Sequence, residues 1–324
     1  MQYDIDQMFK YCEIPEDGKQ YFFEDSNENR KIMLAAFNHN SFMSKYIYMP
    51  ILALRFVFNT EKYEKIYHYL NHESLVSILK DKCFYVGNQQ EMNDSLEGKY
   101  SWNLASNLLN DKDDSPQIRT LFEEIKNRRP FDSYIWSFTL DENNMALQNY
   151  GDIAVVMNPQ KTFESLADKY TNPEFENMNT GNAFILPLRV NYDRQTQLEY
   201  LSNTLDIWLE SIRLGAYGDY QDASLAMYLY SLIFKHPKYH QEEEIRYIIN
   251  KIPDAKGNGY DIKVNGKKKL EAPFLPFLCN EVIVNHRADR IENENINTIQ
   301  AKVDNALNKF GFTNTIVKKT DLEY

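Results

Sequence analysis

Apolar and polar positions follow one another along the chain with two different periods. Apolar residues at every second position, or in short unbroken runs, predict strands at 66–69, 84–86, 133–139, 151–159, 183–192, 242–249, 260–264, 281–284 and 313–317. Apolar residues three and four positions apart predict helices at 75–79, 99–129 (broken by a polar loop at 110–116), 162–170, 197–214, 221–234 and 291–310. Strands and helices do not alternate regularly, so we expect an α+β fold with a split, mainly antiparallel sheet flanked by helices.

The residues before the first strand are expected to be a helical addition. The stretches 31–37 and 42–58 are rich in Met, Leu, Ala and aromatic residues, and Pro50 stands where a helix can begin. This predicts an N-terminal helical extension at 1–62 and one catalytic or binding domain at 63–324. The extension is expected to cover one face of the core, and an arm that binds a partner protein is the alternative.

Composition limits the classes of protein that fit this pattern. The 324 residues contain 43% hydrophobic and 26% charged residues, which are ordinary values for a soluble globular chain. The net charge of −11 argues against non-specific binding to a nucleic-acid backbone, although a local pocket can still bind a nucleotide. Cys12, Cys83 and Cys279 are far apart, which fits free thiols in a reducing compartment. No apolar run reaches the ~18 residues of a membrane span and the start lacks the order of a signal peptide, so we expect a cytoplasmic protein without a membrane segment.

The stretch from Ile66 to Glu97 is the first candidate site. It reads as a strand containing His68 and Tyr69, a short helix, a second strand, and a polar turn with Asn93 and Asp94. A strand histidine facing such a turn can form a polar pocket. The alternatives are a histidine that pairs with a neighbouring carbonyl group, and a turn held only by its own side chains.

The second candidate site is a run of three acids, Glu242 to Glu244, at the start of a strand. Strand alternation would place Glu242 and Glu244 on one face, ~7 Å apart, where two carboxylates can share one substrate. The alternative is a solvated edge with an ion pair to Arg246.

The order of these features resembles a large bacterial family known as domain of unknown function 2971. The resemblance runs from about Ile66 to the C-terminus, and its motifs are the His-Tyr strand at 68–69, Asn93-Asp94 with Glu97, Ser-Phe-Thr at 137–139, the Tyr150-Gly151 step, and Lys235-His236-Pro237 before Glu-x-Glu-x-Arg at 242–246. One position departs from the family pattern, because Ala146-Leu147 stands where the family usually carries a tryptophan.

That family in turn resembles the ADP-ribosyltransferase fold, which implies a function. The resemblance implies an NAD-using effector, of the kind found among toxins and antiphage defence proteins, with NAD as a substrate and a protein or nucleic acid as the acceptor. It assigns catalysis to Glu244, with Glu242 orienting or deprotonating the acceptor. The residues that it places around NAD are His68, Tyr69, Asn93, Asp94, Ser137, Thr139, Tyr150 and Arg246.

Several alternatives remain open from the residues themselves. Ser137 and Thr139 could be buried hydroxyls bonded to the sheet, and we expect Tyr150 to fill the core rather than stack on a nicotinamide ring. A magnesium-dependent hydrolase could use Asp94, Glu97 and the two later glutamates as ligands, whereas the resemblance implies no metal. A non-catalytic interaction or sensor module is the third class.

Overall fold

The computed structural model describes residues 46–47, 52, 55–91, 98–170, 183–251, 261–285 and 295–320. Contacts group the chain into two units. The first consists of Met1–Val57, Gly98–Arg129 and Asp193–Phe234, and the second of Phe58–Glu97, Pro130–Tyr192 and Lys235–Tyr324. The expected boundary after residue 62 and the helical extension stay predictions, because most of residues 1–62 lie outside the described part.

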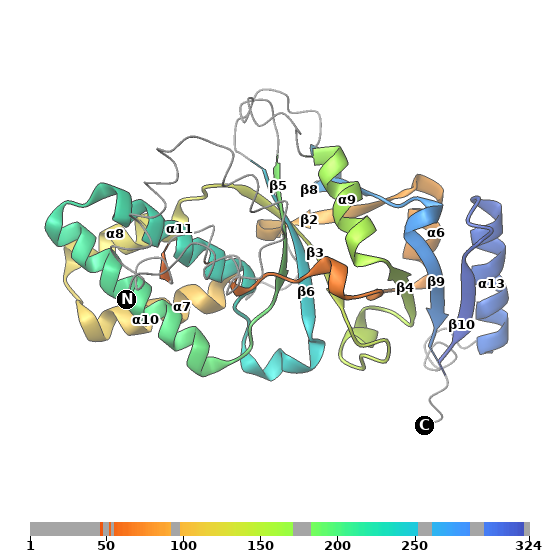
Figure 1. Ribbon diagram of the computed structural model, residues 1–324, viewed down its shortest axis with the longest axis horizontal. Helices are drawn as coiled ribbons and strands as arrows, with labels where there is room; N and C mark the ends of the chain where they lie inside the picture. The colour runs from red at the N-terminus through yellow and green to blue at the C-terminus, as the bar shows by residue number, and fades with distance from the viewer. Residues whose placement is uncertain are drawn as a thin grey trace. The chain divides into compact units, whose positions relative to one another are not determined.

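The described residues of the first unit are mainly helical (Figure 1). Its helices are α7 (Lys99–Lys112), α8 (Pro116–Asn127), α10 (Arg194–Leu214) and α11 (Tyr217–Ile233). An aromatic core joins them, with ring centroids 5.7 Å apart between Trp102 and Phe122 and 6.1 Å apart between Phe122 and Trp208. The helices predicted at 99–129, 197–214 and 221–234 are confirmed, including the polar break before Pro116.

The second unit contains one sheet. Its strands are β1 (Ile66–Leu70), β2 (Cys83–Asn88), β3 (Asp132–Thr139), β4 (Ile153–Met157), β5 (Ala183–Arg189), β6 (Glu244–Lys251), β7 (Asp261–Val264), β8 (Lys267–Pro273), β9 (Cys279–Val284) and β10 (Ile316–Lys319). The order is β10-β9-β4-β1-β3-β2-β8-β7, with β6 paired to both β3 and β5. Every pair is antiparallel except β9 with β10, so the mainly antiparallel sheet is confirmed.

The sheet forks along β3. β6 pairs with β3 over its whole length, from Asp132 to Thr139, and therefore occupies one complete edge. A strand has only two edges, so β1 and β2 must share the other. β2 pairs there at Ile135, opposite Gly87, and β1 pairs at Thr139, opposite Tyr67. Between these two positions the shared edge of β3 lies open, and we call this place the fork.

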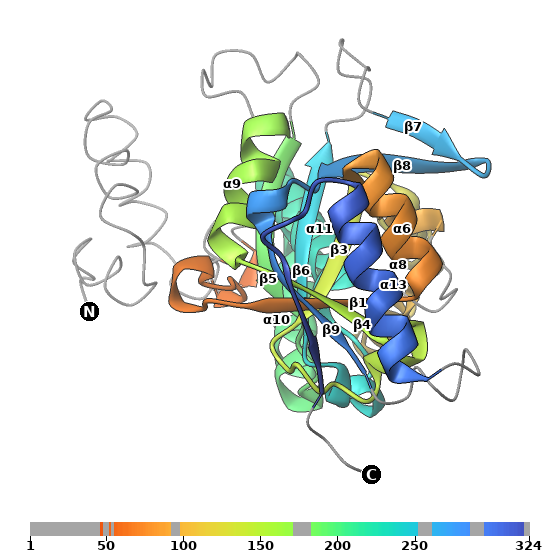
Figure 2. The ribbon, with the colours of Figure 1, turned by 90° about the vertical axis from the view of Figure 1, so that its right-hand side faces the viewer.

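Three helices cover one face of the sheet. They are α6 (His72–Asp81), α9 (Pro159–Tyr170) and α13 (Ile296–Lys309), and α6 and α13 lie side by side (Figures 1 and 2). Their apolar residues, such as Leu75, Leu166 and Val303, pack with Phe84 and Val155 of the sheet into the main core. The opposite face holds a smaller apolar cluster of Tyr67, Tyr69, Ala154, Val156 and Ile283.

The short connections follow the turn chemistry of the sequence. Asn265 and Gly266 join β7 to β8 with φ values of 51° and 78°, as the Asn-Gly pair predicts for a two-residue hairpin. Short 3-10 turns lie at η1 (Thr60–Lys62), η2 (Gln89–Glu91), η3 (Leu147–Tyr150), η5 (Pro237–Glu242) and η6 (Pro276–Leu278). No helix in the described ranges is both long enough and apolar enough to cross a membrane.

Candidate functional site

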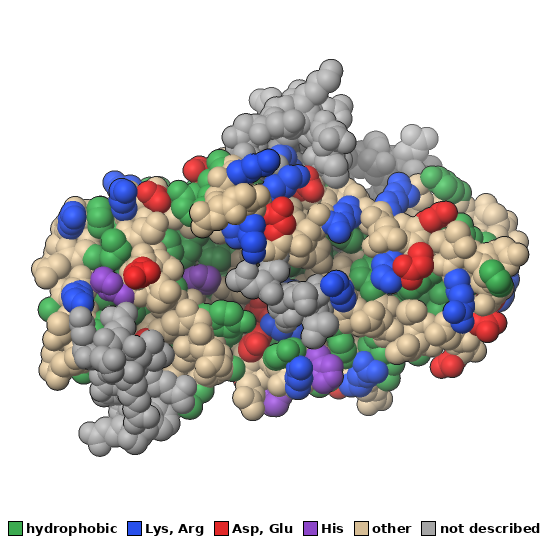
Figure 3. Space-filling model, turned by 180° about the vertical axis from the view of Figure 1, so that it is seen from behind, with side chains coloured by type: hydrophobic (Ala, Val, Ile, Leu, Met, Phe, Trp, Pro, Cys, Tyr) green, Lys and Arg blue, Asp and Glu red, His purple; other side chains and the backbone are tan. Residues whose placement is uncertain are grey.

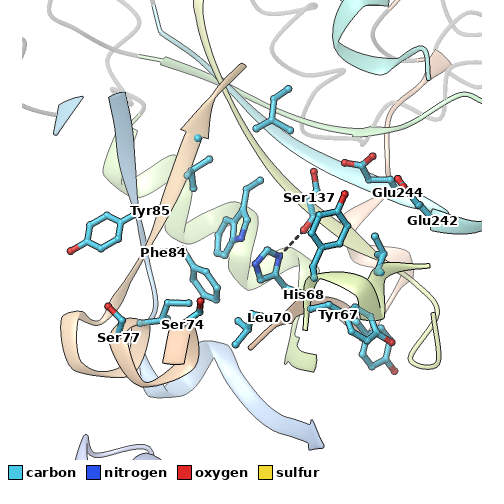
Figure 4. Close-up of a pocket in the computed structure, with 18 of the residues that line it drawn as sticks. Tyr67, His68, Leu70, Ser74, Ser77, Phe84, Tyr85, Ser137, Glu242 and Glu244 are labelled. Atoms are coloured by element: carbon cyan, nitrogen blue, oxygen red, sulfur yellow. Dashed lines mark hydrogen bonds between the residues drawn. The ribbon is translucent and has the colours of Figure 1, made fainter. Parts of the chain in front are cut away.

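A cavity of about 570 Å³ lies at the fork, within the second unit (Figure 4). Residues of β1, α6, β2, β3, η3 and the segment 235–244 line it. The order of the motifs led us to expect His68, Ser137 and Glu244 in one cleft, on one face of the sheet, and all three are among the lining residues. Asn93 and Asp94, which were expected at its rim, lie outside the described residues.

The residues that line the cavity come from both faces of the sheet. Residues directly opposite in an antiparallel pair share a face, while neighbours along a strand point to opposite faces. Tyr67 is opposite Thr139, and Thr139 is opposite Glu244, so all three share a face. His68 therefore belongs to the other face, yet it reaches the same cavity because the sheet is open at the fork. The expectation that His68 and Glu244 would hold one ribose from the same face of the sheet is therefore wrong.

Glu244 is the centre of a buried ionic cluster. Its side chain is buried, and Arg246 donates to both of its oxygens, from Nε to Oε1 and from Nη2 to Oε2, each at 3.0 Å. Lys235 donates to Oε2 of Glu244 at 3.1 Å and also to Glu242. Burial alone would raise the pKa of Glu244, but the Arg246 and Lys235 charges and the hydrogen bonds from Arg246 and Ser137 outweigh it and lower the pKa to about 2. The ion pair with Arg246 was expected, but the solvated edge was wrong.

Glu242 lies beside Glu244 because of a turn that was not expected from the sequence. The expected continuous strand through the three acids is wrong, because Glu242 ends η5 and Glu243 adopts a left-handed conformation with φ 45°. β6 begins only at Glu244. Both carboxylates nevertheless line the cavity and contact Lys235. The turn at Glu243, not strand alternation, brings them together.

Asn144 holds this segment in place. Its buried amide donates from Nδ2 to the carbonyl oxygens of Gln241 at 2.8 Å and Glu242 at 3.1 Å. Its Oδ1 accepts from the Leu147 N–H at 3.0 Å, at the start of η3. One side chain therefore joins the turn after β3 to the carboxylate segment. In the sequence Asn144 is only a polar residue shortly after a predicted strand, and such a residue carries no sign of so distant a partner.

Tyr69 and Thr139 serve the same turn. The Tyr69 hydroxyl donates to the Glu142 carbonyl oxygen at 2.5 Å and accepts from the Asn144 N–H at 3.0 Å, and Tyr69 is also a lining residue of the cavity. Thr139 is fully buried, and its Oγ1 accepts from the Asp141 N–H at 3.2 Å. Thr139 therefore supplies a buried hydroxyl that accepts hydrogen bonds from the turn after β3.

His68 is held in one tautomer at the fork. Its Nδ1 lies 2.8 Å from the Ser137 carbonyl oxygen, which can only accept, so Nδ1 carries the proton (Figure 4). This carbonyl belongs to the open stretch of β3, and the imidazole takes the place of a strand partner. Phe84, Trp136 and Phe138 surround the ring. Burial lowers the pKa of His68 more than the bond to Ser137 raises it, so the ring is neutral at pH 7 and Nε2 is an acceptor.

Two further aromatic residues complete the cavity. Tyr150 is 65% exposed and lines the cavity, so the expectation that it fills the core is wrong. Trp136 lines the cavity from the open stretch of β3, and its buried indole N–H has no hydrogen-bond partner among the described residues. Trp136 and Tyr67 were not singled out from the sequence, and their only signal was their place beside Ser137 and His68. Lys235 was noted only as part of a family motif, with no role in the site.

The lowered pKa of His68 predicts how the stability of the fold depends on pH. The unfolded chain binds the proton near pH 6.5 and the folded protein does so only at lower pH, so stability is expected to fall as pH drops below about 6.5. His68→Gln removes the titrating group and keeps a donor for the Ser137 carbonyl. Urea unfolding at about pH 7.5 and about pH 5.5, on either side of the unfolded pKa, should show a smaller loss on acidification for the variant than for the wild type. An equal loss in both proteins would contradict the neutral His68.

The carboxylates do not form a metal site with the residues that can be placed. In the described part of the chain, no group of three or more His, Cys, Asp or Glu side chains lies close enough to hold a metal ion. Glu242 and Glu244 instead contact the cations of Lys235 and Arg246. Asp94 and Glu97, the other ligands of the expected hydrolase site, lie outside the described residues.

Comparisons with protein-family models, with curated proteins and with solved structures found no match to this chain. The resemblances drawn from the motifs therefore stay predictions. What the structure supplies is a cavity at a fork in an antiparallel sheet, with an ionic side and an aromatic side.

Proposed function

We propose that the fork cavity binds NAD and that the protein transfers its ADP-ribosyl group to an acceptor. The observation that carries this proposal is the buried, ionised carboxylate of Glu244 in a cavity that also offers aromatic surfaces. Cavities of this size, largely apolar with a few convergent polar groups, are typical of small-molecule sites. The fork also resembles the split sheet that the sequence motifs led us to expect.

The chemistry requires a fixed negative charge beside the ribose. When the bond between nicotinamide and ribose C1 breaks, nicotinamide leaves with the electron pair and positive charge develops on the ribose. An ionised carboxylate already in place stabilises that charge more in the transition state than in the ground state. We assign this role to Glu244. The acceptor then bonds to C1 and gives its proton to Glu242.

The remaining cavity residues fit the two ends of such a ligand. Tyr150 is exposed at the cavity and offers a face for a planar ring. His68 offers Nε2 as an acceptor for a ligand N–H or O–H from the other side of the fork. An arginine side chain on a protein is the acceptor that the Glu-x-Glu pattern favours, and a role in a toxin or in antiphage defence is the context that the family resemblance implies.

The test is transfer of labelled ADP-ribose from NAD to proteins of a cell extract. Glu244→Gln should lower the rate by about a hundredfold or more, because the variant lacks the preorganised charge. Glu243→Gln is the matched control, since this neighbouring carboxylate is exposed. The Glu244→Gln variant also loses an ionic partner of Arg246, so circular dichroism must give the folded fraction and rates are expressed per folded protein. Equal labelling by Glu244→Gln and Glu243→Gln would show that Glu244 takes no part in catalysis.

A second function is favoured by one specific observation. Both carboxylate oxygens of Glu244 already accept hydrogen bonds from Arg246 and Lys235, and these cations neutralise much of its charge. Such a cluster suits a module that binds a nucleotide without turning it over. NAD that binds to the wild type without nicotinamide release or labelling would favour this module over the transferase.

A further inference from the structure

The β7–β8 hairpin carries a group of lysines beside the cavity. Four lysines and no acidic residue lie between Lys263 and Lys269. Basic and acidic side chains are interspersed over the face drawn in Figure 3, so the net charge of −11 does not form one acidic field there. A local positive site is therefore compatible with an acidic protein.

Lys269 is placed differently from the other lysines of the hairpin. It lies opposite Gly87 in the pairing of β2 with β8, and Gly87 lines the cavity. Its Nζ lies 3.1 Å from the position that a Cβ atom would occupy at residue 87. The lysine side chain thus lies across β2 toward the cavity, in space that the glycine leaves free.

The register places this ammonium group on the same face as the ionic cluster. Lys269 shares a face with Gly87, and Gly87 shares it with Ile135, its partner on β3. Ser137, two residues beyond Ile135, lies on that face opposite Arg246. One face of the fork therefore carries Glu244 toward the β6 side and Lys269 toward the β8 side.

The surroundings of Lys269 favour an anion. The side chain is half-buried, and burial together with the neighbouring charge of Lys267 lowers its pKa, while Glu91 opposes the shift. Lys267 donates to the Glu91 carbonyl oxygen at 3.0 Å, and Lys268 lies on the other face, 3.9 Å from Asp132. A bound anion would offset the repulsion between Lys267 and Lys269.

We propose that Lys269, lying over Gly87, binds the phosphate groups of the ligand in the fork cavity, which makes the ligand class a dinucleotide or another pyrophosphate-bearing nucleotide. This inference rests on the proposed function, because it takes NAD as the ligand and assigns its ribose and its pyrophosphate to different parts of the cavity. The ribose that reacts lies at Glu244, and the pyrophosphate lies at the β2 edge.

The test is calorimetric binding of three probes at low salt: NAD, nicotinamide riboside, which lacks the pyrophosphate, and inorganic pyrophosphate. Lys269→Gln should weaken NAD and pyrophosphate about tenfold and leave nicotinamide riboside unchanged. Gly87→Ala moves Nζ by only a few tenths of an ångström, so it should weaken NAD and pyrophosphate less than Lys269→Gln does. Lys263→Gln, on the exposed other face of the hairpin, should change none of the three affinities.

The outcomes separate this site from the proposed function. Unchanged NAD affinity in Lys269→Gln, or an equal loss for nicotinamide riboside, would overturn the phosphate site and leave the transferase intact. Pyrophosphate binding that depends on Lys269, in a wild type that does not bind NAD, would support the site and overturn the NAD proposal. A wild type that binds none of the probes would overturn both.

Discussion

Gly151→Ala is expected to destabilise the protein by about 3 kcal/mol or more. A Cβ at this position would lie 2.0 Å from the carbonyl carbon of Leu70 and 2.2 Å from its oxygen. These are backbone atoms at the end of β1, where Leu70 pairs with Ile153 of β4, so they cannot move without breaking the ladder. The φ of 156° adds a conformation that residues with a side chain rarely adopt.

Urea unfolding measures this loss, and Gly218→Ala is its control. A Cβ at Gly218 meets no atom within 4 Å, and the residue lies in α11, where alanine is the better helix former. The control should be neutral or slightly stabilising. Similar unfolding midpoints for the two variants would show that the contact between Gly151 and β1 is not as close as the structure gives it.

Arg246→Met is the second variant with a large expected effect, a loss of about 3–5 kcal/mol. Arg246 is 3% exposed and Glu244 is 5% exposed. The substitution therefore leaves a buried carboxylate without the bidentate hydrogen bonds that Arg246 donates. Lys235 donates to Oε2 of Glu244, and this single contact cannot replace both hydrogen bonds from Arg246. Methionine keeps most of the volume, so the loss reports charge more than packing.

The dependence of this loss on pH provides the check. In the wild type the pKa of Glu244 is lowered, so its ionic contribution is present above the unfolded pKa of about 4.3 and is lost as pH falls toward 2. Without Arg246, burial raises that pKa, and protonation removes the unpaired charge. The difference in unfolding free energy between variant and wild type should therefore be largest near pH 7 and shrink toward about pH 4. A constant difference would indicate lost packing instead of lost charge.

A double variant, Arg246→Met with Glu244→Gln, removes the unpaired charge by a second route. It should recover part of the stability lost in Arg246→Met at neutral pH, because a neutral amide costs less to bury than a carboxylate. No recovery would contradict the ionic explanation.

The sequence patterns predicted the helices and strands well, because helix and strand formation depends mainly on residues close together in the chain. The apolar period gave β3, β4, α10 and α13 within a few residues, and Asn265-Gly266 gave the hairpin. The period also identified His68, Ser137 and Glu244 as strand residues, and their motif order led us to expect one cavity. These are properties of neighbouring residues, so one sequence carries them.

The geometry of the site depended on causes that a single sequence does not show. The fork follows from three strands competing for two edges of β3, and it decides that His68 and Glu244 reach the cavity from opposite faces. The left-handed Glu243 is a bulky residue in a conformation usually taken by glycine or asparagine, and only tertiary contacts can impose it. Lys235, Asn144 and Lys269 gain their roles from residues distant in the chain or on a neighbouring strand.

The fork also has a consequence for synthesis of the chain. β3 acquires its partners from both directions, with β1 and β2 already made and β6 still to come. While the ribosome adds the residues from Leu140 to Glu243, one complete edge of β3 has no partner, and an open edge of this kind invites pairing with other chains. The ionic half of the cavity, Lys235 to Arg246, is made after the aromatic residues around His68. A nascent chain shorter than this can hold aromatic surface around His68 but has no carboxylate with which to act, so any activity of the cavity begins only after β6 has docked.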